Sequence, residues 1–219
     1  MKRVFAIVIM FLLLSSSSFA QEGGIRLNLY GNFVFADKFD SYYDRGNGYF
    51  YSGRIEEGFQ WGGGLEYMVN PIFGVELMYL RQDTNSPTRY RFVAGPEEFT
   101  NFDLAINYVL INPTRYFRTP GSPFEAYGGF QIGGVFANLT NPDNGRDDTA
   151  TKLAVGLRGG GIYWASDYVG IKAQAQFISV VQSVGGGFYF GTGGSGVGVS
   201  SYSSIFQFGL GLGVALKLN

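Results

Sequence analysis

FQFGLGLGVALKL, residues 206–218, lies at the end of a chain of 219 residues and decides the fold. Large apolar side chains occupy every second position, and small or polar residues lie between them. Successive side chains of a β-strand point to opposite faces, so this alternation predicts a strand with one continuous apolar face. That face holds Phe206, Phe208, Leu210, Leu212, Val214, Leu216 and Leu218.

The same period of two recurs throughout the chain. Together with 203–218, the segments that show it are 25–36, 59–69, 72–82, 100–111, 124–138, 151–165 and 168–181. Each is long enough to cross a bilayer as a tilted strand, which takes about 9–11 residues. Eight such segments predict an all-β fold, an eight-stranded antiparallel up-and-down transmembrane β-barrel, over residues 21–219.

Charged residues in these segments lie opposite the apolar faces. The polar faces carry five bases and four acids, which we expect to form a charge network in the lumen: Arg26, Lys152, Arg158, Lys172, Lys217, Glu66, Glu76, Asp103 and Glu125. A soluble, lipocalin-like barrel is the alternative, but its interior would then be apolar and its charges would face water. The near balance of signs favours a membrane barrel whose closed interior holds paired ions.

Aromatic residues cluster near the strand ends, as in the girdles of membrane barrels. We expect Trp61, Tyr67, Tyr79, Tyr108 and Tyr163 to belong to such a girdle, although strands are in general rich in aromatics. In segment 100–111 this interpretation turns five residues toward lipid, and they are Phe102, Leu104, Ile106, Tyr108 and Leu110.

Loop lengths predict the orientation of the barrel. The connections 37–58, 83–99, 139–150 and 182–202 are long, those at Asn70-Pro71 and Ser166-Asp167 are tight, and 112–123 is intermediate. Outer-membrane barrels have short periplasmic turns and longer extracellular loops. Both termini are therefore expected on the periplasmic side.

The N-terminus has the layout of a secretory signal peptide. Lys2 and Arg3 precede an unbroken apolar run from Val4 to Leu14, and Ser18 and Ala20 offer small residues for cleavage. The run is shorter than the roughly 20 residues of a transmembrane helix. We expect residues 1–20 to be removed on export, with a retained anchor as the alternative.

These features together resemble the small outer-membrane β-barrel family, of the eight-stranded OmpA/OmpX-like and porin-like kind. The resemblance covers essentially the whole chain after Gly24 and rests on architecture rather than on a short motif. It implies a location in the outer membrane of a Gram-negative bacterium. It also implies contact with lipopolysaccharide and insertion by the barrel-assembly machinery.

Composition excludes much chemistry. The chain has no Cys and no His, so disulfides, thiolate metal sites and imidazole catalysis are excluded. Barrel enzymes of the family use a His, so we expect no enzyme, cofactor or metal, although a Ser-Lys or carboxylate-only site stays open.

The net charge of -1 gives no case for nucleic acid. A faint calcium-loop pattern, Asp143, Asn144, Asp147 and Asp148, is better explained as a turn.

Three roles fit these features. The first is a structural, adhesive or partner-binding barrel that acts through its extracellular loops and has a polar lumen filled by side chains. The second is a narrow channel or conduit for small or hydrophobic solutes, with free volume beside the inward glycines Gly64, Gly129, Gly133, Gly156, Gly160, Gly209, Gly211 and Gly213. The third is an accessory subunit of a secretion system.

Overall fold

A closed β-barrel is the core of the molecule. The computed structural model describes residues 24–39, 50–91, 96–181 and 205–218, and the signal segment and the 182–202 connection lie outside them. Within these ranges the chain forms ten strands and no helix that could cross a membrane. They are β1 (Ile25–Val34), β2 (Asp37–Phe39), β3 (Phe50–Ile55), β4 (Gly58–Asn70), β5 (Phe73–Arg91), β6 (Glu97–Arg118), β7 (Phe124–Asn141), β8 (Arg146–Trp164), β9 (Val169–Val181) and β10 (Ile205–Lys217).

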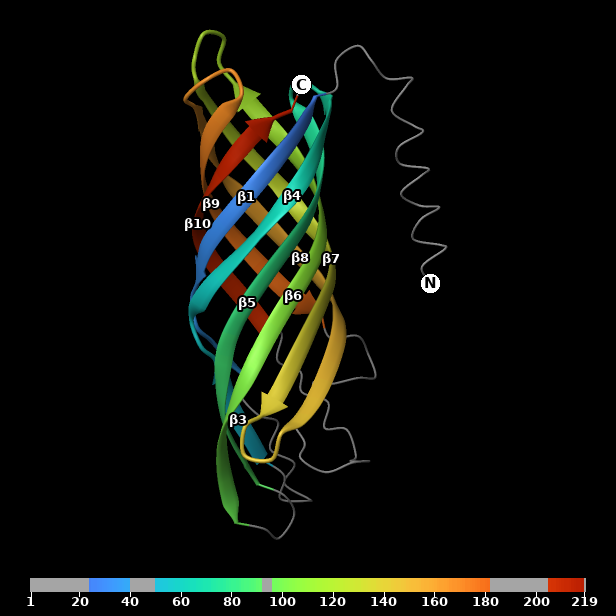
Figure 1. The fold of residues 1–219 in the computed structure, drawn as a ribbon, viewed down its shortest axis with the longest axis vertical. Helices are drawn as coiled ribbons and strands as arrows, with labels where there is room; N and C mark the ends of the chain where they lie inside the picture. The colour runs from blue at the N-terminus through green and yellow to red at the C-terminus, as the bar shows by residue number, and fades with distance from the viewer. Residues whose placement is uncertain (1–23, 40–49, 92–95, 182–204, 219) are drawn as a thin grey trace, which may run out of the picture.

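Eight of these strands tilt around a common axis and close a ring (Figure 1). All neighbours in the order β1-β4-β5-β6-β7-β8-β9-β10 are antiparallel, and β1 pairs with β10 from Arg26 opposite Lys217 to Val34 opposite Gly209. The expected eight-stranded antiparallel barrel is confirmed. Closure pairs every edge, which a sheet in lipid requires. The short strands β2 and β3 continue the sheet beyond the ring, where β3 pairs with the far end of β5.

A band of exposed apolar side chains surrounds the barrel. Leu65, Ile132 and Leu212 are 53%, 50% and 66% exposed, and the outward faces of β1, β4, β5, β7, β8, β9 and β10 are those that the alternation predicts. A soluble protein rarely exposes so large a continuous apolar surface. On a membrane barrel it is the surface that contacts lipid.

Strand β6 is the exception, and there the expected orientation is wrong. The side chains of Phe102, Leu104, Ile106, Tyr108 and Leu110 are buried inside the barrel, whereas Asp103 is exposed on the outer face. The apolar band on the outer face of β6 ends near Val109, which is 42% exposed. Within the band Val109 and Ile111 face outward, so Leu110 between them points inward. Beyond the band the outer face of the strand meets water, and there Phe102, Leu104 and Ile106 turn inward as in a soluble sheet.

The hairpins also differ from the expected loop lengths. Segments 83–99 and 139–150 are mostly strand: β5 and β6 pair out to Arg91 and Glu97, and β7 and β8 are joined by a tight turn at 142–145. At the other end, β6 continues to Arg118, so the intermediate 112–123 connection shrinks to a turn in which Gly121 has φ +78. The C-terminus lies at this end and β3 at the opposite end, as Figure 1 shows.

The inward glycines do not leave empty space, contrary to the expectation. A Cβ at Gly64 would collide with the carboxylate of Glu76, and one at Gly211 would collide with the amide of Asn32. A Cβ at Gly133 would collide with the backbone of the neighbouring strand. These glycines give room to polar side chains and to closely packed strands.

Candidate functional site

The lumen has two zones. Toward the end with the C-terminus it holds the charged side chains, together with a small apolar group made up of Met68, Tyr116, Tyr127, Ile162 and Ala215. Toward the end with β3 it holds a larger apolar cluster. The members of the apolar cluster are Tyr30, Ile55, Met78, Leu80, Leu104, Ile106, Tyr108, Leu110, Val135, Ala137, Ala154, Ile178, Val180 and Ile205. The expectation of a polar lumen therefore holds only in part, because the larger cluster is apolar although Gln82, Ser86 and Thr88 are buried polar residues toward the β3 end.

A buried ion pair lies at the centre of the polar zone. Arg158 on β8 and Glu76 on β5 have fully buried side chains, with Nη1 and Oε2 2.6 Å apart. Arg158 also donates to the hydroxyls of Thr114 at 2.8 Å and Tyr30 at 3.2 Å. In a dry interior such a pair needs further hydrogen bonds to its remaining polar groups. Asn28 and Tyr30 donate to Glu76 Oε1 at 2.8 Å and 2.7 Å, whereas Arg158 Nε has no hydrogen-bond partner among the described residues.

A second cation and a second anion flank this pair. Lys172 on β9 donates from Nζ to Asn28 at 3.2 Å and to Tyr30 at 3.1 Å. Glu66 accepts a hydrogen bond from the hydroxyl of Tyr116 at 2.5 Å and lies directly opposite Glu76 in the β4–β5 register. Two neighbouring carboxylates thus share two cations, so the centre of the lumen is close to neutral.

The end of the lumen near the C-terminus carries a further set of charges. Arg26 and Arg118 lie 3.6 Å and 3.1 Å from the carboxylate oxygens of Glu125. The ring of Trp164 contacts two cations, with Lys217 Nζ 3.8 Å and Arg26 Cζ 5.1 Å from its centroid. Cation–π contacts of this kind hold charge against an aromatic face without a carboxylate partner.

Amides fill the lumen beside the charges and also within the apolar cluster. Gln176 donates to Gln60 at 2.6 Å, and Gln174 donates to Asn32 at 2.9 Å. The hydroxyl of Tyr108 donates to Gln207 at 2.5 Å across the barrel. This arrangement can fix the cross-section of the barrel.

The structure places the candidate residues as follows. Seven charged residues point into the polar zone: Arg26, Glu66, Glu76, Glu125, Arg158, Lys172 and Lys217. Lys152 is half-buried on the inner face of β8. Asp103 lies outside the lumen, where it accepts a hydrogen bond from Asn85 at 2.9 Å. Trp61, Tyr67, Tyr79 and Tyr163 face outward, whereas Tyr108 is fully buried inside and is not a girdle residue.

Sequence reasoning missed the neutral partners of these charges. Asn28 and Tyr30 share the parity of Arg26 on β1, so the alternation that selected Arg26 could have found them. Tyr116 lies in segment 112–123, which the sequence predicts to be a connection, so the alternation assigns its side chain to neither face of a strand. The same holds for Tyr90 in the predicted connection 83–99.

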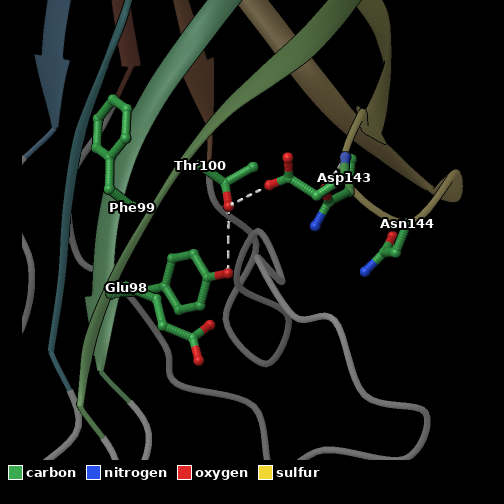
Figure 2. Close-up of a pocket in the computed structure, with 7 residues that line it drawn as sticks. Glu98, Phe99, Thr100, Asp143 and Asn144 are labelled. Atoms are coloured by element: carbon green, nitrogen blue, oxygen red, sulfur yellow. Dashed lines mark hydrogen bonds between the residues drawn. The ribbon is translucent and has the colours of Figure 1, made fainter.

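A pocket opens on the inner side of the sheet at the end of the barrel with β3 (Figure 2). Its volume is about 350 Å³, and its lining residues are Tyr90, Glu98, Phe99, Thr100, Asn141, Asp143 and Asn144. The hydroxyl of Thr100 lies between two partners, 3.3 Å from the Tyr90 hydroxyl and 3.2 Å from Asp143 Oδ2. Figure 2 shows Thr100 and Asp143 pointing toward each other and the ring of Phe99 pointing away.

The oxygens of the calcium-like pattern serve the β7–β8 turn. Asn144 accepts from the backbone of Arg146, Asp147 from the hydroxyl of Thr140, and Asp148 from the backbone of Thr149. Within the described ranges, no group of three or more His, Cys, Asp or Glu residues could hold a metal ion. These contacts are those of an ordinary turn.

Comparison with known families identifies the barrel. Residues 6–161 match the family model described as "Outer membrane protein beta-barrel domain", which is more than half of the chain. The chain belongs to this family. It is therefore an outer-membrane β-barrel protein, in agreement with the apolar band and the closed ring.

Solved structures of outer-membrane barrels are similar to it. Neisserial surface protein A aligns at 16% identity and a TM-score of 0.59, over 90% of this chain and 100% of that chain. OprG from Pseudomonas aeruginosa aligns at 14% identity and a TM-score of 0.48, over 89% of this chain and 96% of that chain. Ail of Yersinia pestis aligns at 14% identity and a TM-score of 0.46, over 90% of this chain and 100% of that chain. At these identities the likeness concerns the fold alone. A search of curated proteins found no match.

Proposed function

We propose that this outer-membrane barrel is a non-enzymatic protein that presents a binding or adhesive surface outside the cell. The β5–β6 hairpin carries the proposal, because it continues well past the apolar band. On β5 the outward apolar residues end at Tyr79, and the outward positions from Arg81 to Arg91 are mostly polar. About ten residues per strand then lie beyond the band, which is on the order of 30 Å of strand.

The projecting hairpin is well packed on its inner side. Ser86, Thr88 and Thr100 are almost completely buried there, and β3 and β7 pair with its two edges. A rigid sheet that extends from the membrane can hold a partner-binding surface at a constant height. This favours a binding role over a purely structural one.

The packing of the lumen supports a closed barrel. A barrel of eight strands has room for side chains or one small ligand, and here side chains of both zones occupy the interior. This packing does not favour the channel alternative, and no contact among the described residues favours a secretion subunit. The proposal includes export with loss of residues 1–20, insertion by the assembly machinery and lipopolysaccharide against the outer half of the apolar band.

A shortened hairpin tests the proposal. Removal of residues 85–88 together with 100–103 deletes four facing pairs and preserves both register and face alternation. Bacteria that display this variant are expected to attach severalfold less well to polystyrene and to fixed epithelial cells than bacteria that display the full chain. Heat-modifiable gel migration confirms that the variant barrel is folded.

A control variant that keeps the hairpin at full length separates the effect of hairpin length from the effect of the residues that the deletion removes. Asn85→Ala with Asp103→Ala removes the exposed hydrogen bond between these residues but leaves the hairpin at full length. Its attachment is expected to stay near that of the full chain. Equal attachment by the full chain and the shortened variant on both surfaces would refute an adhesive role for the hairpin.

A further inference from the structure

The extracellular pocket combines an aromatic ring with negative charge. Tyr90 and Thr100 are 8% and 4% exposed and form its floor, and Glu98 and Asp143 supply two carboxylates. Among the described residues that line it, none is Lys or Arg. The nearby Arg91 lies on the opposite face of the hairpin, with its guanidinium 4.0 Å from Glu97. The carboxylates thus face the pocket without a basic neighbour in its lining.

The polar groups of the pocket are held in place before any ligand arrives. Asn141 is 4% exposed, and its Oδ1 accepts a hydrogen bond from the backbone N–H of Asp143 at 2.9 Å. The Thr100 hydroxyl then connects Asp143 with Tyr90. Burial is the main reason that the pKa of Tyr90 lies above its usual range, so this hydroxyl remains neutral and can donate. Such ordering lowers the entropy cost of binding.

We propose that this pocket binds a protonated amine that also carries hydroxyl groups, a ligand of the amino-sugar class. Two carboxylates complement the ammonium charge, and the ring of Tyr90 offers a face to the same cation. Amide and hydroxyl groups of Asn141, Asn144 and Thr100 complement hydroxyls of the ligand. The volume of about 350 Å³ suits a single sugar ring rather than a long chain.

The inference rests on the proposed extracellular binding role and specifies a ligand for it. Isothermal titration of the full-length barrel in nanodiscs with glucosamine tests it, with N-acetylglucosamine as the neutral counterpart. Glucosamine is expected to bind, and N-acetylglucosamine is expected to bind at least tenfold more weakly, since it lacks the ammonium charge. Glu98→Gln and Asp143→Asn are each expected to weaken glucosamine binding roughly tenfold, the usual effect of losing a charged hydrogen bond.

A matched variant controls for the general negative field. Glu97→Gln removes the same charge from the adjacent position but on the outer face of β6, so glucosamine should bind it as it binds the full chain. Equal binding of the two sugars, equal weakening by Glu97→Gln and Glu98→Gln, or absence of glucosamine binding would each overturn the assignment. If glucosamine fails to bind while hairpin-dependent attachment persists, only the ligand assignment fails and the binding role stands.

Discussion

At the scale of single residues, the barrel interior depends on matched charges. Glu66 and Glu76 face each other on adjacent strands, a pairing of like charges that is unfavourable alone. Arg158 contacts one of them, and Tyr116 and Asn28 donate to the other. The neutral donors are therefore as necessary to the interior as the cations.

Removing one partner of the central pair should destabilise the barrel strongly. Glu76→Gln leaves the Arg158 guanidinium buried without its carboxylate, and we expect a loss of about 3–5 kcal/mol in urea unfolding from lipid vesicles. Replacing both residues by Met should recover much of the loss, because no unpaired charge remains. The exposed control Glu97→Gln should change stability by less than about 0.5 kcal/mol. A single variant as stable as the full chain would contradict a structural role for the pair.

Asp37 should titrate above the usual range of aspartates. It lies beyond the apolar band, where partial burial raises its pKa although its Oδ2 accepts the backbone N–H of Phe206 at 2.8 Å. A raised pKa means that the folded state binds this proton more tightly, so the group favours folding at low pH and this contribution is lost as pH rises through the folded pKa. An NMR titration that follows the chemical shift of the Phe206 amide measures the pKa of Asp37. In the control variant Asp37→Asn this shift should not change over the same pH range. A midpoint at or below about 3.9 would be inconsistent with the burial.

At the scale of elements, close strand approach decides where a glycine is required. Gly133 and Gly128 lie on the same strand, β7, but only Gly133 faces the backbone of β6 at a distance that excludes a Cβ. At Gly128 the nearest atom would be 3.9 Å away, an ordinary contact. The two positions form a matched pair.

Gly133→Ala should weaken the β6–β7 pairing. The added methyl would collide with the Val109 carbonyl, and overpacking of this kind costs about 1–3 kcal/mol. Gly128→Ala should be neutral or slightly stabilising, because it restricts only the unfolded chain. The two variants are compared by the temperature at which half of the barrel loses its folded gel migration. Equal midpoint temperatures would show that β6 and β7 can move apart at little cost in free energy.

The N-terminal segment should be absent from the exported protein. Intact-mass measurement of the barrel isolated from outer membranes is expected to place the first residue at Gln21. Ala20→Phe replaces the small residue at the cleavage position, so this variant should keep residues 1–20. Wild-type protein that retains them would favour the anchor instead.

At the scale of the whole molecule, the outer surface of the barrel changes character along its length. In the membrane its outside is apolar, and its inside combines charged residues such as Glu66 with apolar ones such as Met78. Beyond the membrane the order reverses, as at Phe102 and Asp103 on β6. The solvent outside the wall changes from lipid to water, and the preferred face of each strand changes with it.

Two serial barriers should keep the barrel from conducting. We expect no stable single-channel steps from the purified protein in planar bilayers in concentrated KCl. Glu76→Gln should still give none when its barrel is folded, because the apolar cluster around Leu80 and Leu110 closes the half of the lumen toward β3. Steady currents from the full chain would favour the channel alternative. Currents from Glu76→Gln alone would place the barrier at the ion pair.

Much of the fold followed from period-two alternation. It located all eight barrel strands and the outward faces of seven, and the parity of Arg26, Glu76, Arg158 and Lys172 placed them in the lumen. Parity could not place Asp103 and Tyr108, because their face depends on whether lipid or water lies outside the wall at that height. That height depends on strand tilt and on the length of each hairpin.

The sequence by itself determined a closed barrel with an apolar band, since in lipid only a closed ring satisfies the backbone of such strands. It also determined the absence of imidazole and thiol chemistry. Only the tertiary structure decided which side chains meet across the lumen, because pairs such as Tyr108 with Gln207 come from strands that are not neighbours in the ring. The pocket likewise depends on the pairing of β5, β6 and β7, which brings Tyr90, Thr100 and Asp143 close together.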